Sequence, residues 1–193
     1  MNDHQNLREP VALAALWADT HAAGFTMASE PLTGSLLRTL AGSKPGGQLL
    51  EIGTGTGLST AWLLDGMDAR ATLTTVDNDD AVLDIARRHL GHDPRLSVVC
   101  ADGDAWLDTL APGTFDLIFA DSWPGKYRRL PETLALLRPG GLYVVDDMLP
   151  QPNWPEGHEL KAAALLETLT TLPGFSTTVL SWVTGMVLVS RTD

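Results

Sequence analysis

Three glycines spaced two residues apart, Gly53, Gly55 and Gly57, follow the apolar run 49–52 and lead into a helical pattern. We interpret this stretch as a buried strand, a tight turn and the start of a helix. Because glycine has no Cβ, such a turn can adopt backbone angles closed to other residues and lets a ligand lie against the main chain. The N–H groups at the helix start can face a carboxylate or a phosphate, so the turn predicts a site for a nucleotide-like ligand.

The spacing of these glycines bears on which ligand is bound. The dinucleotide fingerprint G-x-G-x-x-G/A, counted from Gly53, requires a small residue where this chain has Leu58. An ordinary loop is a further alternative for a glycine-rich turn taken by itself. The stretches that follow the turn therefore decide its role.

Strand and helix patterns alternate after residue 47. Strands are expected at 48–52, 71–76, 96–100, 115–120 and 142–145, and helices at 59–66, 79–90, 103–110, 126–137 and 156–172. Short connections between them predict a doubly wound α/β fold, with a mostly parallel sheet covered by helices on both faces. The β-rich runs 175–183 and 186–191 flank Thr184-Gly185, which predicts a hairpin and an antiparallel strand at the C-terminal end of the sheet.

The N-terminal part carries two more helical patterns, at 10–23 and 31–40, before a linker at 42–47. We therefore expect one domain over residues 1–193, with residues 1–46 as an N-terminal helical cap segment. A chain of 193 residues can bury roughly 70% of its unfolded surface without disulfide or metal staples.

Charge and hydropathy exclude several classes of partner. The balance of 13 basic and 24 acidic residues gives a net charge of −11, which repels nucleic acid and anionic lipid. No apolar run approaches the roughly 18 residues that a membrane span needs, and no signal peptide is recognisable at the start. We expect a soluble, cytoplasmic protein that acts on a small molecule, with the single cysteine, Cys100, in the core.

Acidic residues follow nearly every predicted strand, at the edge where open α/β sheets bind ligands. Asp77 could accept two hydrogen bonds from a ribose diol, and Asp102 one from an adenine amino group, with Asp104 as the competing residue. Asp121 follows the fourth strand, and Asp146 and Asp147 follow the fifth. Taken singly, an acid at such a position is often a helix cap or turn former instead.

Three of these carboxylates come close together if the fourth and fifth strands are neighbours, since adjacent strands lie about 4.8 Å apart. Unpaired, Asp121, Asp146 and Asp147 would raise one another's pKa values. A divalent cation such as Mg²⁺ removes that conflict, and it would also lower the pKa of a bound hydroxyl. The structural alternative has Asp147 capping the final loop and Asp146 bound to backbone.

Two segments, 115–127 and 136–147, together with the Glu51-x-Gly53-x-Gly55-x-Gly57 motif, resemble the metal-dependent S-adenosylmethionine (SAM) O-methyltransferases of the catechol and caffeoyl-CoA type. The resemblance covers the chain from about Met27 to the C-terminus. It implies a seven-stranded, Rossmann-like SAM-binding fold, transfer of the sulfonium methyl group to a metal-bound hydroxyl, and a homodimer as in many related enzymes.

The resemblance also implies roles for individual residues. The cofactor-binding set lies at the strand ends and in the N-terminal segment, and comprises Met27, Glu51, Gly53, Thr54, Gly55, Gly57, Ser59, Asp77, Asn78, Asp102, Gly103, Asp121 and Trp123. The metal ligands would be Asp121, Asp146 and Asp147, and the catalytic residues Asp121 and Lys126.

The chain departs from this family at two places. Asp146-Asp147 stands where the family usually has Asp-Asn, a change that should still allow a divalent cation. The family's catalytic lysine usually follows the strand-four aspartate by three residues, where this chain has Pro124. The nearest lysine, Lys126, is either returned to the reacting oxygen by the loop as a general base or is a solvated lysine at a helix start.

The sequence says least about the identity of the methyl acceptor. The proline-rich loop 148–158 lies where an acceptor would enter, and Trp154 would either offer a flat surface for an aromatic ring or fold back over apolar core. The five histidines show no ligand spacing, so none is assigned. We expect methyl transfer to a hydroxyl of a small, catechol-like molecule. The alternatives are a metal-independent methyltransferase for an amine or carboxylate, a SAM-binding protein without turnover and, last, an NAD-dependent oxidoreductase.

Overall fold

The computed structural model describes residues 2–5 and 7–193. The strands are β1 (Gln48–Ile52), β2 (Thr72–Asp77), β3 (Leu96–Cys100), β4 (Phe115–Ala120), β5 (Leu137–Val145), β6 (Phe175–Leu180) and β7 (Met186–Arg191). The helices are α1 (Leu13–Ala22), α2 (Pro31–Gly42), α3 (Leu58–Gly66), α4 (Asp80–Leu90), α5 (Gly103–Leu107), α6 (Leu130–Ala135) and α7 (His158–Thr171).

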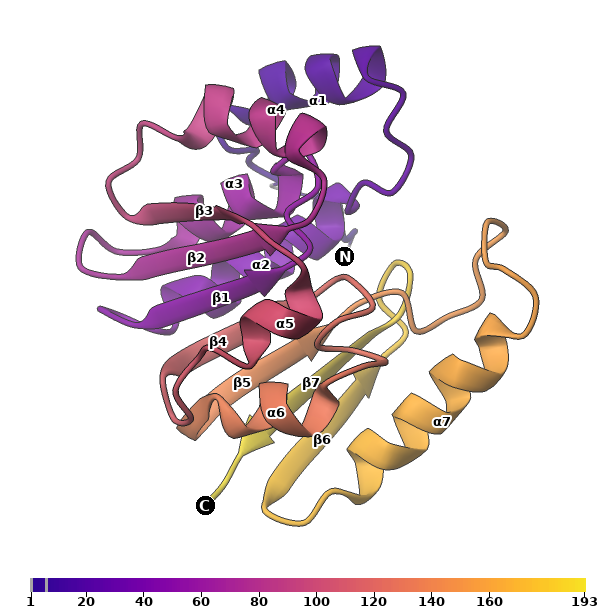
Figure 1. Cartoon of the computed structure of the whole chain (residues 1–193). Coiled ribbons are helices and arrows are strands. Elements are labelled where there is room, and N and C mark those ends of the chain that lie inside the picture. Colours follow the sequence, from indigo (N-terminus) through magenta and orange to yellow (C-terminus); the bar gives the residue numbers. More distant parts are fainter. Residues whose placement is uncertain (1, 6) are drawn as a thin grey trace.

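The seven strands form one sheet in the order β3-β2-β1-β4-β5-β7-β6 (Figure 1). Strands β1 to β5 pair in parallel, and β7 runs antiparallel between β5 and β6. This arrangement confirms the expected doubly wound α/β sheet with an antiparallel C-terminal strand. The parallel strands end at one edge, and the strand order reverses next to β1, where ligands bind in folds of this type.

Alternate residues along the strands face opposite layers of helices. Leu49 and Phe119 pack in one core with residues of α1, α2, α3 and α4, whereas Leu50 and Ile118 pack in a second core with residues of α5, α6 and α7. The two groups of helices can be followed in Figure 1. Burial on both faces explains why the runs 117–120 of β4 and 142–145 of β5 are continuously apolar rather than alternating.

Two expectations about the segment after β4 are wrong. The expected helix over 126–137 is only α6, Leu130–Ala135, and β5 begins at Leu137 instead of 142. Pro124 and Gly125 delay the start of the helix, because the chain makes a tight turn there in which the Gly125 N–H donates to the Arg128 carbonyl at 2.8 Å. Gly125 has a φ of +80°, and a Cβ there would lie 2.5 Å from Ile52 Cδ1, so the turn requires glycine.

Cys100 is exposed rather than in the core, because it ends β3, the strand at one edge of the sheet. Within residues 2–5 and 7–193, no helix is long and apolar enough to cross a membrane.

Candidate active site

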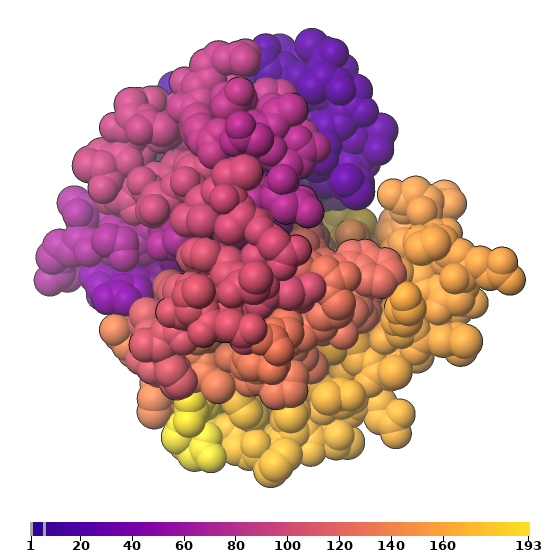
Figure 2. Space-filling model, viewed as in Figure 1, coloured from indigo at the N-terminus to yellow at the C-terminus, as the bar shows by residue number. Residues whose placement is uncertain are grey.

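A cavity of about 660 Å³ opens at the carboxyl edge of the parallel strands. This volume lies within the roughly 300–1,000 Å³ range of small-molecule sites. Its walls are the glycine turn, the ends of β2, β3, β4 and β5, the segment 25–30 before α2, and residues 151–158 before and at the start of α7. Figure 2 shows the surface hollowed between the N-terminal part of the chain and the orange segment that leads into α7.

The glycine turn forms one end of this cavity. Gly53 has a φ of +103°, and a Cβ on it would lie 2.7 Å from the Asp121 carbonyl oxygen, so only glycine lets β1 end this close to the end of β4. The Gly55 N–H donates to Asp77 Oδ2 at 2.9 Å, which ties the turn to the end of β2. Asp77 Oδ1 accepts from the Asp79 N–H at 3.1 Å. The carboxylate of Asp77 is therefore held at the cavity wall by backbone donors.

Most of the predicted cofactor residues share this cavity. Met27, Gly53, Thr54, Gly55, Ser59, Asp77, Asn78, Asp102, Gly103, Asp121 and Trp123 all line it. Glu51 and Gly57 are not among the lining residues. The Glu51 side chain is fully buried behind the turn, and Gly57 packs against α4, where a Cβ on it would lie 2.9 Å from Ala86 Cβ. Glu51 Oε2 instead accepts hydrogen bonds from the hydroxyls of Thr60 and Thr75.

Asp102 and its competitor Asp104 differ in position. Asp102 lines the cavity and also caps α5, since its Oδ1 accepts from the Ala105 N–H at 3.0 Å. Asp104 does not line the cavity, and its Oδ2 accepts from Arg128 Nε at 2.7 Å. The geometry therefore favours Asp102 as the residue that can face a ligand, even though it is also a helix cap.

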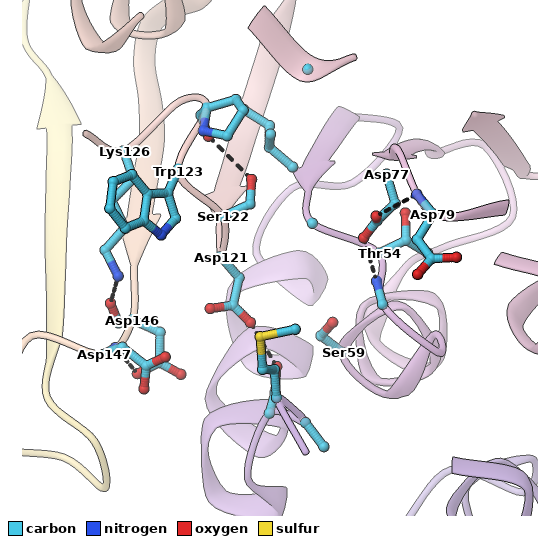
Figure 3. A pocket seen from close by; sticks show the side chains of 18 of the residues that line it. Thr54, Ser59, Asp77, Asp79, Asp121, Ser122, Trp123, Lys126, Asp146 and Asp147 are labelled. Atoms are coloured by element: carbon cyan, nitrogen blue, oxygen red, sulfur yellow. Dashed lines mark hydrogen bonds between the residues drawn. The ribbon is translucent and has the colours of Figure 1, made fainter. Parts of the chain in front are cut away.

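Three aspartates and one lysine gather at the other end of the cavity. In Figure 3, Thr54 and Asp77 lie on one side of Asp121, and Lys126, Asp146 and Asp147 lie on the other. We call Asp121, Lys126, Asp146 and Asp147 the acid–lysine cluster. Its members come from the ends of β4 and β5, which are neighbouring parallel strands, and from the turn after β4.

Asp121 is the centre of this cluster. Removal of its carboxyl group from water and repulsion by Asp146 and Asp147 raise its pKa well above the usual range. The positive charge of Lys126 opposes this shift, as does the Ser29 hydroxyl, which donates to Asp121 Oδ2 at 3.0 Å. The Asp121 side chain is therefore held in place from the N-terminal segment of the chain.

Lys126 is buried, with an exposed fraction of 4%, and its Nζ donates to the Asp146 carbonyl oxygen at 2.5 Å. Burial lowers the pKa of Lys126, and the charges of the three aspartates act in the opposite direction. The alternative of a solvated lysine at a helix start is therefore wrong. The turn at Pro124-Gly125 directs the side chain inward to the acids.

The two aspartates that follow β5 differ in their surroundings. Asp146 Oδ1 accepts from the Thr184 hydroxyl at 2.6 Å and from the Asp147 N–H at 2.8 Å. Burial and the negative charge of Asp147 raise the pKa of Asp146. Asp147 itself has a left-handed φ of +54° and lines the cavity. Within the described parts of the chain, 2–5 and 7–193, no three His, Cys, Asp or Glu side chains are grouped closely enough to hold a metal ion.

Aromatic rings line the cavity beside the acid–lysine cluster. Trp154 lies against His158 with ring centroids 4.6 Å apart, and Trp123 lies 5.8 Å from the same ring. Tyr127 Oη and His158 Nε2 are 3.0 Å apart. Trp154 also lines the cavity, and its role as a flat surface for an aromatic acceptor stays a prediction.

Sequence reasoning missed several residues of this site, among them Ser29, Tyr127, His158 and Thr184. The position of Tyr127, directly after Lys126, was a usable signal. The others reach the site only through packing of segments distant in sequence, as with the Ser29–Asp121 hydrogen bond across 92 residues.

Comparisons with known proteins, by sequence and by structure, agree with one another. A family model described as "Methyltransferase domain" matches residues 50–148. A Mycobacterium tuberculosis protein named "Probable O-methyltransferase Rv1220c" is 37% identical over 123 residues, which are 61% of this chain and 55% of that protein. The chain thus matches about half the length of this curated relative.

Two solved structures are similar over nearly the whole chain. Cofactor-bound Rv0187 from M. tuberculosis is 27% identical with a TM-score of 0.86, covering 99% of this chain and 94% of that one. The O-methyltransferase TomG from Streptomyces achromogenes, solved in complex with SAM, is 25% identical with a TM-score of 0.84 and the same coverage. Since the family model spans more than half of the chain and includes the glycine turn and the acids after β4 and β5, the protein belongs to the methyltransferase-domain family.

Proposed function

We propose that the protein is a SAM-dependent O-methyltransferase that methylates a hydroxyl group of a small molecule. The observation that carries this proposal is one cavity with a glycine turn at one end and the acid–lysine cluster at the other. Further support comes from TomG and Rv0187, whose structures are described as holding SAM and a cofactor.

The cofactor-binding roles follow from position. Asp77 would accept hydrogen bonds from a ribose diol, and Asn78, Asp102 and Gly103 would border the adenine. Met27 and Trp123 would border the methionine end. When bound, SAM supplies a methyl group on a positively charged sulfur. The carboxylates of the acid–lysine cluster at this end of the cavity would stabilise that positive charge. The cavity walls would align the reacting atoms.

Lys126 is the proposed general base. Its buried Nζ lies within the acid–lysine cluster, and its lowered pKa increases the neutral fraction that can accept a proton from an acceptor hydroxyl. Asp121 would keep the resulting ammonium group in place through its charge. Hydrogen bonds to other segments hold both side chains in place.

A divalent cation fits the chemistry of the donor set. Three carboxylates face one ammonium group, and the bonds from Ser29 and Thr184 use only one oxygen each of Asp121 and Asp146. Hard oxygen donors with an excess of negative charge suit Mg²⁺. Asp121, Asp146 and Asp147 would have to draw closer together to hold it, because within residues 2–5 and 7–193 they are not grouped as a metal site. Once held, it would lower the pKa of an acceptor hydroxyl.

A metal-independent methyltransferase is the second candidate. Two observations favour it: the three aspartates are not grouped as a metal site within residues 2–5 and 7–193, and Lys126 already compensates part of their charge. An amine or carboxylate would then be the alternative acceptor.

Transfer of a labelled methyl group from SAM to a panel of catechols and other phenols tests the proposal, with Mg²⁺ or with EDTA. Transfer that EDTA abolishes and Mg²⁺ restores supports the metal-assisted enzyme, and equal transfer in EDTA supports the second candidate. SAM binding without transfer to any phenol, amine or carboxylate would contradict both and favour a SAM-binding protein without turnover.

The proposed location is the cytoplasm, and the proposed assembly is a homodimer. Light scattering on the purified protein would measure the molecular mass and so test the assembly, because a monomer has a mass of 20.7 kDa.

A further inference from the structure

Tyr127 and His158 form a hydrogen-bonded pair in the aromatic part of the cavity. They come from elements far apart in sequence, the turn after β4 and the first residue of α7, and their rings meet edge to face at 5.0 Å. Both residues line the same cavity as the acid–lysine cluster, and the Tyr127 ring centroid is 5.2 Å from Lys126 Nζ. The pair is thus next to the proposed reacting position.

His158 has an unmet hydrogen-bonding requirement. Its side chain is buried, at 7% exposure, and within residues 2–5 and 7–193 its Nδ1 has no hydrogen-bond partner. Buried polar atoms are rarely left without a partner, because the lost hydration is then not replaced. Trp154 and Trp123 pack around the ring without supplying one. A bound ligand or water would therefore supply the hydrogen bond that this nitrogen lacks within the described residues.

The charge states of the two groups define what the pair can offer. Burial and the positive charges of Lys126 and Lys161 lower the pKa of His158, against the opposing charges of Asp147 and Glu159, which favours the neutral ring. Burial and the charge of Asp147 raise the pKa of Tyr127 to about 12, so its phenol keeps its proton. A neutral imidazole has one donor and one acceptor nitrogen.

Two tautomers of the pair exist. If Tyr127 donates to Nε2, then Nδ1–H is a free donor and the phenol oxygen a free acceptor. If Nε2–H donates to the phenol oxygen, the free donor is the phenol O–H and the free acceptor is Nδ1. In either case the pair presents one donor and one acceptor. Because Tyr127 Oη contacts Nε2, on the other side of the ring from Nδ1, one oxygen atom of a ligand can bind to only one of these two groups.

Building on the proposed function, we propose that Tyr127 and His158 are positioning residues that bind a second oxygen of the methyl acceptor, not the one methylated. The pair would hold an acceptor hydroxyl or carbonyl group while the acid–lysine cluster receives the reacting hydroxyl. An acceptor with two oxygens would then be preferred over one with a single hydroxyl.

Steady-state kinetics of Tyr127→Phe and His158→Ala test this proposal, with SAM and with the two-oxygen acceptors catechol and 3,4-dihydroxybenzoate, and with phenol as the acceptor that has only one oxygen. The KM for a two-oxygen acceptor is expected to rise about tenfold in each variant, the effect of one lost hydrogen bond to a ligand, while the KM for SAM stays unchanged. His158→Asn, which keeps a polar group near the Nδ1 position, is expected to recover part of the loss. The double variant is expected to be no worse than His158→Ala, because the two residues act as a unit.

The exposed His92→Gln provides a matched control and is expected to behave as wild type. A decrease in kcat together with equal increases in the KM for SAM and the KM for the acceptor would indicate a merely structural pair and overturn the proposal. A melting temperature that falls in parallel with the loss of activity would do the same. If the wild type methylates phenols and both variants keep its KM for the acceptor, the proposal is overturned as well. A wild type that binds SAM but methylates none of these acceptors would overturn the proposed function and this inference together.

Discussion

At the residue scale, Glu51 stabilises the glycine turn from behind without lining the cavity. Its carboxylate is fully buried between β1, β2 and α3 and accepts hydrogen bonds from Thr60 and Thr75. Burial raises its pKa from 4.5 to about 7, although the hydroxyl donors act in the opposite direction. One oxygen of this carboxyl, Oε1, lacks a partner within residues 2–5 and 7–193.

This raised pKa predicts a pH-dependent stability. Between pH 4.5 and 7 the folded protein holds a proton on Glu51 that the unfolded chain has released, so stability falls as the pH rises through this range. The loss amounts to at most about 3 kcal/mol for this group. Urea unfolding of wild type and Glu51→Gln at pH 5 and pH 8 checks it, since the variant is expected to gain stability relative to wild type at the higher pH. If the unfolding free energies of the two proteins differed by the same amount at pH 5 and at pH 8, the prediction would be contradicted.

Asp121→Asn separates function from stability at the acid–lysine cluster. The variant removes a carboxylate repelled by Asp146 and Asp147 but keeps an oxygen for the Ser29 hydroxyl. Methyl transfer is expected to fall by about 100-fold or more, as when one preorganised electrostatic group is lost, while the melting temperature at pH 8 rises. Radiolabel transfer and thermal unfolding give the two readouts.

Asp116→Asn is the matched control, because Asp116 lies within β4 and Asp121 directly follows this strand. Asp116 lies at the far end of β4 and pairs with Arg138 and the Gln48 N–H. This variant is expected to lose stability and keep turnover. A destabilised Asp121→Asn with normal transfer would refute the proposed role of Asp121.

At the element scale, the packing of α2 on α3 fixes the N-terminal segment that borders the cavity. Gly34 on α2 faces the buried ring of Trp62 on α3, and a Cβ at Gly34 would lie 2.2 Å from Trp62 Cδ1. Residues 25–30, which carry Met27 and Ser29, run directly into α2. The contact between these two helices therefore determines where those residues stand.

Gly34→Ala is expected to destabilise the protein by about 1–3 kcal/mol, the usual cost of overpacking, despite the higher helix propensity of alanine. Thr39→Ala, at an exposed site of the same helix, is expected to change the unfolding free energy by no more than about 0.5 kcal/mol. Urea unfolding measures both. If Gly34→Ala were as stable as wild type, α2 would have to be free to move away from α3.

At the scale of the whole molecule, ligand binding and folding are coupled, because the cavity is built from segments at both ends of the chain, from Phe25 to Thr184. The unfolded chain offers no such site. A ligand that fits the cavity therefore stabilises the native state as a whole.

S-adenosylhomocysteine at 100 times its Kd is expected to add about 2.7 kcal/mol to the free energy of unfolding. For a chain of this size, that corresponds to a rise of roughly 5–10 °C in melting temperature. Differential scanning fluorimetry measures the shift, with NAD at the same concentration as the comparison ligand. An equal shift with NAD, or none with S-adenosylhomocysteine, would exclude the assignment of the glycine turn to SAM.

The sequence by itself determined the order of strands and helices, the glycine turn and the edge at which the acids meet. These features follow from local patterns, and parallel strands must end at one edge of a sheet, so Asp77, Asp102 and Asp121 come to a common site wherever their helices lie. The doubly wound sheet with its antiparallel C-terminal strand was predictable for the same reason.

Only the tertiary structure decided how the chemistry of that edge is arranged. Whether Lys126 is solvated or buried depends on the turn at Pro124-Gly125 fitting against Ile52, and this contact leaves no periodic signal. Likewise Tyr127 meets His158, and Ser29 meets Asp121, only after distant segments have packed together. Local propensity acts over a few residues, whereas burial and pairing of these side chains depend on contacts that form once the whole sheet is assembled.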